Sequence, residues 1–201
     1  MRFKEVFKNH IKDNLFKYIF IVAVLAIGIF LGNYKSTALE GGVRGYLLEL
    51  VDNYLDYSLH LEGNELFLKA FLNQAEMLLL IWFLGLTVIG FPLILAVVFF
   101  RGFSLGFTTG FLIHEKAGSG VIIALLSVLP QNLVYIPLFI FWAVTAFDFS
   151  LYILKGNQNQ AMPLFRGIFV YTLLLLAVLF FLALGALIEA YLVPWFLSIV
   201  F

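Results

Sequence analysis

The feature that most constrains this chain is the stretch Phe71–Gly110, which is apolar almost throughout. Similar stretches occupy Tyr18–Gly32, Val121–Phe147 and Ile168–Ile188. A helix crosses the bilayer in about 20 apolar residues. Runs of this length have no solvated face, so the core of a 201-residue soluble domain cannot account for them. The sequence therefore predicts an all-α polytopic helical membrane protein.

Composition supports this prediction and excludes several function classes. Hydrophobic residues make up 63% of the chain, against roughly 45–50% in soluble domains. The twelve acidic and twelve basic residues balance, so no long-range field attracts nucleic acid. The absence of cysteine excludes disulfides and thiolate catalysis. We expect one integral membrane domain over residues 1–201, with membrane lipid as its main environment.

The first seventeen residues are predicted to form a helix on the membrane surface. Lys4, Lys8 and Lys12 recur every four residues beside an apolar face, a pattern typical of interfacial helices. The excess of basic residues predicts a cytoplasmic N-terminus. A cleaved signal peptide is the alternative, but the first apolar stretch ends without a clear small-residue cleavage site, which favours an uncleaved anchor.

Residues 33–75 are then expected outside the cytoplasm. Within them, Val43–Leu61 keeps apolar residues at helical spacing, which predicts an amphipathic helix. Its apolar face includes Leu50 and Tyr54, and its acidic face carries Glu49, Asp52 and Asp56. This helix either rests on the outer leaflet or on its own bundle, or docks an extracytoplasmic partner.

The remaining residues, 76–201, are expected to form a packed bundle, with two alternatives for the number of crossings. In one, the chain turns at Gly90-Phe91-Pro92 and crosses five times. In the other, a crossing ends at Arg101, and Gly102–Ile113 becomes a re-entrant piece in a four-span protein. We favour five crossings, because a helix that neither spans the membrane nor faces water needs protein around it.

A glycine ridge marks the second half of this stretch. Gly102, Gly106 and Gly110 recur every four residues, and Gly28 and Gly32 form a shorter ridge in the first span. Glycine ridges let helices approach closely. The ridge predicts packing within one bundle; the alternative is an interface between subunits of a homo-oligomer.

Polar groups within the spans also point to specific contacts, because charge in the bilayer is costly. Arg101 either needs a carboxylate or snorkels from a helix end; the candidate carboxylates are Glu76, Asp148 and Glu189. Gln131 and Asn132 follow Pro130, where a helix loses a backbone hydrogen bond. Their amides either satisfy the freed carbonyls or bond across to a neighbouring helix.

The sequence shows no recognisable catalytic centre. Gly102–Gly106 matches the G-x-S-x-G pattern of serine hydrolases, but no strand precedes it. The three histidines are isolated, and no nucleotide-binding loop is present. We therefore expect no catalytic residue, bound metal or cofactor.

Three segments carry a resemblance to a known family: Trp82–Pro92, Arg101–Phe111, and Ser127–Asn132 followed by Pro137. They resemble the stage II sporulation protein M family, and the Leu-Pro-Gln-Asn segment is the most specific part. The resemblance implies a multi-pass protein of the septal or engulfing membrane in sporulating cells. It further implies a non-enzymatic component that positions peptidoglycan hydrolases, stage II sporulation proteins D and P, during engulfment.

We therefore favour a membrane scaffold for cell-wall hydrolases. The main alternative is a permease or channel subunit, since helices broken at Pro92, Pro130 and Pro137 and polar groups in the spans are features of transporters. A hydrolase in its own right is a distant third.

Overall fold

The computed structural model describes residues 12–60, 63–115, 121, 126, 128–155 and 164–195. Within these ranges the fold is all-helical and has no strand, as predicted. The helices are α2 (Leu15–Thr37), α3 (Gly41–His60), α4 (Gly63–Gly85), α5 (Gly90–Glu115), α7 (Leu129–Leu154), α8 (Leu164–Leu187) and the π-helical η2 (Ile188–Leu192).

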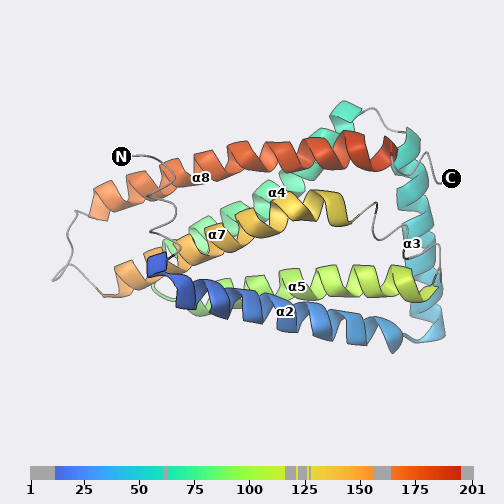
Figure 1. Ribbon diagram of the computed structural model, residues 1–201, viewed down its shortest axis with the longest axis horizontal. Coiled ribbons are helices and arrows are strands. Elements are labelled where there is room, and N and C mark those ends of the chain that lie inside the picture. Colours follow the sequence, from blue (N-terminus) through green and yellow to red (C-terminus); the bar gives the residue numbers. More distant parts are fainter. Residues whose placement is uncertain are drawn as a thin grey trace.

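Five of the described helices are long and apolar enough to cross a membrane: α2, α4, α5, α7, and α8 with its continuation to Trp195. They lie lengthwise in one bundle, and successive spans run in opposite directions (Figure 1). Because α5 continues unbroken past Arg101, the five-span prediction is confirmed and the re-entrant alternative is wrong.

The helix α3 lies crosswise at one end of the bundle, where α2 ends and α4 begins (Figure 1). We call this the α3 end, and the other the opposite end. The helix predicted over Val43–Leu61 is thus present as Gly41–His60. The flanking helices extend into the predicted loop, residues 33–75, because α2 runs to Thr37 and α4 begins at Gly63.

The turn between α4 and α5 lies at Leu86–Ile89, so the predicted turn at Gly90-Phe91-Pro92 is wrong. Pro92 belongs to the first turn of α5, where backbone N–H groups have no intrahelical acceptor and proline is tolerated. Ser150 of α7 fixes this turn: its Oγ accepts a hydrogen bond from Phe91 N at 3.0 Å and donates to Thr87 O at 2.8 Å.

Proline also starts α7 rather than interrupting it. The predicted span began at Val121, whereas α7 begins at Leu129 with Pro130 in its first two positions. Proline suits this place because its ring presets the helical φ angle and its missing N–H would have no partner. Pro137 does lie inside the helix, as expected.

The predicted surface helix over residues 1–17 falls mostly outside the described residues. Lys12 and Asp13 are helical, a turn follows at Asn14, and α2 starts at Leu15. The first span therefore begins three residues before the predicted Tyr18.

Aromatic packing joins α4, α7 and α8 at the bundle centre. Trp142 is fully buried, and its indole N–H donates to Leu78 O at 3.0 Å. Tyr171 stacks on Trp142 with a centroid separation of 5.0 Å, and Phe149 stacks on Tyr171 at 4.4 Å. Trp142 sits at the middle of α7, so its bond to Leu78 marks the depth at which α4 crosses the bundle centre.

Candidate functional site

The helix α3 is attached to the bundle by few described contacts. Arg44 Nε donates to Glu115 Oε2 at 2.6 Å, and the Glu115 side chain is only 7% exposed. Two turns further along, Val51 packs against Leu112 of α5, and Val128 packs against the same leucine. These contacts hold the first half of α3 against the end of α5.

The opposite face of α3 is open. Val43, Tyr46 and Leu50 follow helical spacing and are exposed, and Glu49 is exposed beside them. The predicted apolar face is therefore divided, with Val51 turned toward the bundle and these three side chains turned away. Asp52, Tyr54 and Asp56 also belong to α3, but the structure does not describe their side chains.

The glycine ridge of α5 faces α2. A Cβ atom added at Gly102 would collide with Leu25 O, one at Gly106 with Ile29 O, and one at Gly110 with the side chains of Ser36 and Asn33. The facing residues advance together along both helices, so α2 and α5 are parallel and in register. Gly28 and Gly32 complete the contact from the α2 side, against Phe99, Phe103 and Phe107. The structure thus places the ridge inside one bundle.

A polar cluster lies within the membrane-spanning part between α5, α7 and the end of α8. Arg101 interacts electrostatically with Glu189 and Tyr135. Tyr135 Oη donates to Glu189 Oε2 at 2.9 Å. Gly185, one turn before Glu189, leaves the space that the Tyr135 ring occupies. Glu189 belongs to η2, and π-helical turns alter the direction in which side chains leave a helix.

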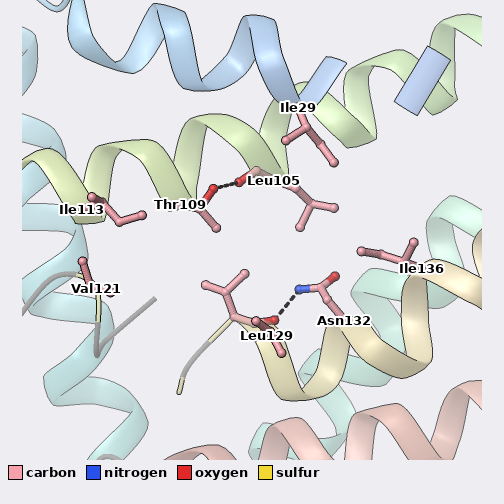
Figure 2. A pocket seen from close by; sticks show the side chains of 9 residues that line it. Ile29, Leu105, Thr109, Ile113, Val121, Leu129, Asn132 and Ile136 are labelled. Atoms are coloured by element: carbon pink, nitrogen blue, oxygen red, sulfur yellow. Dashed lines mark hydrogen bonds between the residues drawn. The ribbon is translucent and has the colours of Figure 1, made fainter. Parts of the chain in front are cut away.

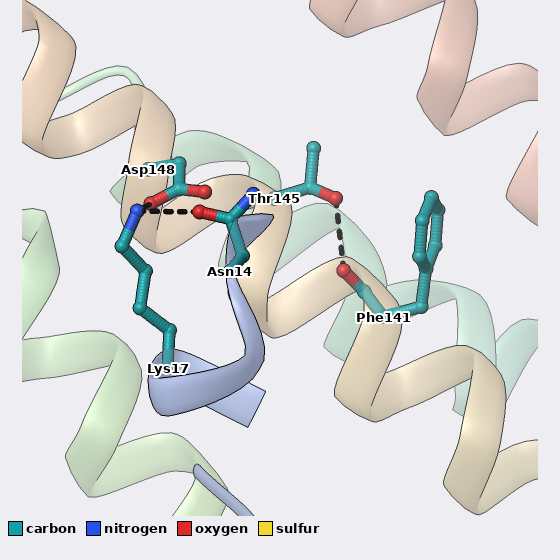
Figure 3. A network of polar contacts seen from close by, with 5 residues as sticks. All are labelled: Asn14, Lys17, Phe141, Thr145 and Asp148. Atoms are coloured by element: carbon teal, nitrogen blue, oxygen red, sulfur yellow. Dashed lines mark hydrogen bonds and ion pairs between the residues drawn. The ribbon is translucent and has the colours of Figure 1, made fainter. Parts of the chain in front are cut away.

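The other two carboxylates proposed for Arg101 lie elsewhere. Asp148 accepts an ion-paired hydrogen bond from Lys17, whose ammonium also donates to Asn14 Oδ1 at 2.7 Å (Figure 3). This network ties the start of α2 to the last turns of α7 at the opposite end. Glu76 is exposed on the outside of α4.

Gln131 and Asn132 are both buried in the first turn of α7. Asn132 Nδ2 donates to Val128 O at 2.7 Å, so this amide satisfies a carbonyl at the helix start. Figure 2 shows Asn132 beside a cavity of about 290 Å³ between α5 and α7, with Ile29 of α2 on its wall. The described lining residues are apolar except for Thr109 and Asn132.

The structure also locates the serine motif and the possible metal ligands. Ser104 lies in the middle of α5 and is exposed, away from any strand-to-helix turn that would activate a nucleophile. Among the described residues no group of three or more histidine, aspartate or glutamate side chains is arranged to hold a metal. The arrangement is that of a packed bundle with a lightly held crosswise helix.

Sequence reasoning missed two members of the polar cluster, Tyr135 and Gly185. Their only sequence signals are weak: a hydroxyl-bearing aromatic two residues before Pro137, and a glycine four residues before Glu189. It also missed the Lys17–Asp148 pair, because the two residues are 131 positions apart and only the bundle brings them together.

Comparison with known families completes this description. The family model for stage II sporulation protein M matches residues 18–194, from the first turn of α2 to the last described turn of the chain. Comparisons with curated proteins and with solved structures give no match. The matched region covers α3 and all five candidate spans except the first three residues of α2 and Trp195. The chain therefore belongs to the stage II sporulation protein M family.

Proposed function

We propose that this protein is a non-enzymatic membrane scaffold that positions peptidoglycan hydrolases at the septal membrane during engulfment. The hydrolases resemble stage II sporulation proteins D and P. Membership of a sporulation family and a multi-span helical fold support the general role. The exposed face of α3 is the observation that carries the docking role.

The charge distribution favours a cytoplasmic N-terminus, because basic residues dominate the first seventeen positions. Alternating spans then put the α3 end on the extracytoplasmic side, where peptidoglycan lies. This orientation presents α3 to the wall and to any enzyme that acts on it.

The composition of the exposed face suits a protein partner. Tyr46 is 62% exposed, Val43 48% and Leu50 45%, and Glu49 adds a negative charge beside them. Interfaces combine an aromatic or aliphatic anchor with a polar rim.

A permease would need a polar route through the bundle. The described polar groups instead form separate clusters, and the centre around Trp142 is filled by apolar and aromatic side chains. This packing favours a scaffold over a transport subunit.

The proposal is tested by reversing the charge of α3. In sporulating cells, the combined change Glu49→Lys, Asp52→Lys and Asp56→Lys should lower crosslinked recovery of the hydrolases by about tenfold or more, since like charges across an interface cost several kcal/mol. The amount of scaffold in the membrane should stay constant, because these residues are expected to face away from the bundle.

Glu65→Lys is the matched control. Glu65 is exposed in the first turn of α4 at the same end of the bundle, so this change reverses a charge on the same side without altering α3. Equal recovery of hydrolases with the α3 variant and the wild type would remove α3 from the docking role. An equal loss with Glu65→Lys would show a general charge effect instead.

A further inference from the structure

The outer face of α4 carries charge into the middle of the membrane. Glu65, Lys69, Asn73 and Glu76 are all exposed and follow each other at intervals of three or four residues, so they share one side of the helix. The same side continues with exposed Leu80 and Phe83 toward the opposite end. We call the surface made by Leu72, Asn73, Glu76, Leu80 and Phe83 the outer α4 face.

Glu76 lies near mid-length of the bundle, the level expected at the centre of the bilayer. Leu78, two residues further along, accepts the indole hydrogen bond of Trp142, and Trp142 is at the middle of α7. Two residues of helix span about 3 Å, so Glu76 is within one turn of this central level. Charged groups at such depth cost about 2.5–3.5 kcal/mol even on insertion scales, and they almost always face protein or a water-filled cavity.

Nothing that the structure describes compensates Glu76. No hydrogen bond or ion pair joins it to another described residue, and α4 packs its opposite side on α7 and α8 through Leu78 and Ile81, which are buried. Arg101, the one other charged residue near this level of the spans described, belongs to the cluster with Glu189 and Tyr135. Among the described residues, therefore, none neutralises Glu76, which leaves a partner in the membrane as a source of the compensating charge.

A second copy is a poor source of it. In a two-fold dimer of copies inserted in the same direction, the axis lies along the membrane normal, so residues at the centre of the interface meet their counterparts at the same depth. A dimer formed through the outer α4 face would place Glu76 against Glu76, and like charges at that depth repel strongly. A partner of different sequence has no such restriction.

We propose that the outer α4 face binds a membrane-spanning helix of a different protein, which places a lysine or arginine near the bilayer centre against Glu76. Asn73 supplies an amide one turn away for a further hydrogen bond, and Leu72, Leu80 and Phe83 supply the apolar contact around the pair. This inference rests on the proposed scaffold function, because it describes how a membrane-anchored partner would be held within the bilayer.

The test uses a photo-crosslinking amino acid at Leu80 in the full-length chain in sporulating cells. Leu176 on α8 is the matched control position, since it is 58% exposed and Leu80 is 47% exposed. We expect an adduct at Leu80 and none at Leu176. Mass spectrometry should locate the attachment point of this adduct in a membrane-spanning segment of the partner. That segment should contain a lysine or arginine within one turn of the attachment point.

Charge substitutions then decide whether Glu76 is the contact. Glu76→Leu should lower the adduct yield by about tenfold or more, as expected for loss of an ion pair in a low-dielectric environment. Exchange of the two charges, Glu76→Lys with glutamate at the partner's basic position, should restore it. Asn73→Leu should give a smaller loss, and if Glu76→Leu reduced folded protein, the charge exchange would still test the contact.

Adducts only with lipid, adducts with a second copy of this chain, or a captured helix without a basic residue would each overturn the inference. So would an adduct that Glu76→Leu leaves unchanged. The two proposals fail separately. A captured helix from a protein that is not a hydrolase would support the outer α4 face and contradict the hydrolase scaffold. Hydrolase recovery that depends on α3, with no helix crosslinked at Leu80, would support the hydrolase scaffold and contradict the outer α4 face.

Discussion

The helices α5 and α4 each carry a charged residue through the membrane, Arg101 and Glu76, and the two side chains differ in what surrounds them. On α5, Gly102 and Gly106 face α2, and Arg101 interacts with Glu189 and Tyr135. On α4, Asn73 and Glu76 face away from the bundle.

This difference separates two roles. On α5, Gly102, Gly106 and Arg101 make contacts within one chain, so their replacement should lower the stability of that chain. On α4, Asn73 and Glu76 bond to no described residue, so their loss should lower the affinity for a partner and not the stability of the chain. The following substitutions test this division.

Replacement of Gly106 by leucine should have the largest effect. Even a Cβ atom at this position would overlap Ile29 O of α2, and backbone cannot move aside cheaply. Overpacking costs about 1–3 kcal/mol in ordinary cores and more where backbone must shift. We expect a large drop in folded protein after detergent extraction, measured by size exclusion and thermal unfolding. Gly106→Ala should show a smaller drop in the same direction.

Gly167→Ala is the control for this effect. A Cβ atom there would meet Phe149 and Tyr152 at 3.5 Å, an ordinary van der Waals distance, and alanine favours a helix over glycine by about 1 kcal/mol. Its thermal stability should equal or exceed that of the wild type. Normal folding of Gly106→Leu would contradict the close α2–α5 contact.

The helical fold could be predicted because its signals are local. Long apolar stretches predict spans, and α3 follows from helical spacing over Val43–Leu61. The helix ends were harder to place. Pro92 and Pro130 were interpreted as breaks, yet both lie in first turns, where proline is favourable. A proline indicates that a helix begins or ends nearby, but it does not indicate whether the helix precedes or follows it.

Replacement of Glu189 by leucine should have an intermediate effect. Arg101 would lose its nearby carboxylate, and Tyr135 would lose the acceptor of its hydrogen bond to Glu189. Loss of a buried hydrogen-bond partner costs about 1–3 kcal/mol. Thermal unfolding should shift downward, and Tyr135→Phe should shift it less because the carboxylate beside Arg101 is kept. An unshifted transition for Glu189→Leu would show that the cluster does not stabilise the fold.

The site residues were less predictable than the fold, since their roles depend on which face meets which neighbour. The sequence named three carboxylates for Arg101, but only the bundle separates Glu189 from Asp148, which pairs with Lys17, and from Glu76 on the outside. Periodicity identifies a glycine ridge without identifying α2 as the helix it meets. The depth of a charged side chain in the membrane, and the helix that it faces, are set by how the helices assemble, so the sequence alone does not give them.

Replacement of Glu76 by leucine should have the smallest effect on the isolated chain. Because its side chain is exposed and bonded to no described residue, the change removes no internal contact, and it places an apolar group where the bilayer is apolar. Surface substitutions usually change stability by no more than about 0.5 kcal/mol. In purified protein, the unfolding temperature should be unchanged or raised.

Arg101→Leu is the matched comparison, since it also removes one charge near the bilayer centre. It leaves Glu189 without its nearby cation, so the unfolding temperature should fall. If Glu76→Leu lowered stability as much as Arg101→Leu, Glu76 would have a partner within its own chain, and α4 would not differ from α5. If only Arg101→Leu lowers it, the charge on α4 serves association rather than folding, because a costly group that stabilises nothing within the chain requires a function outside it.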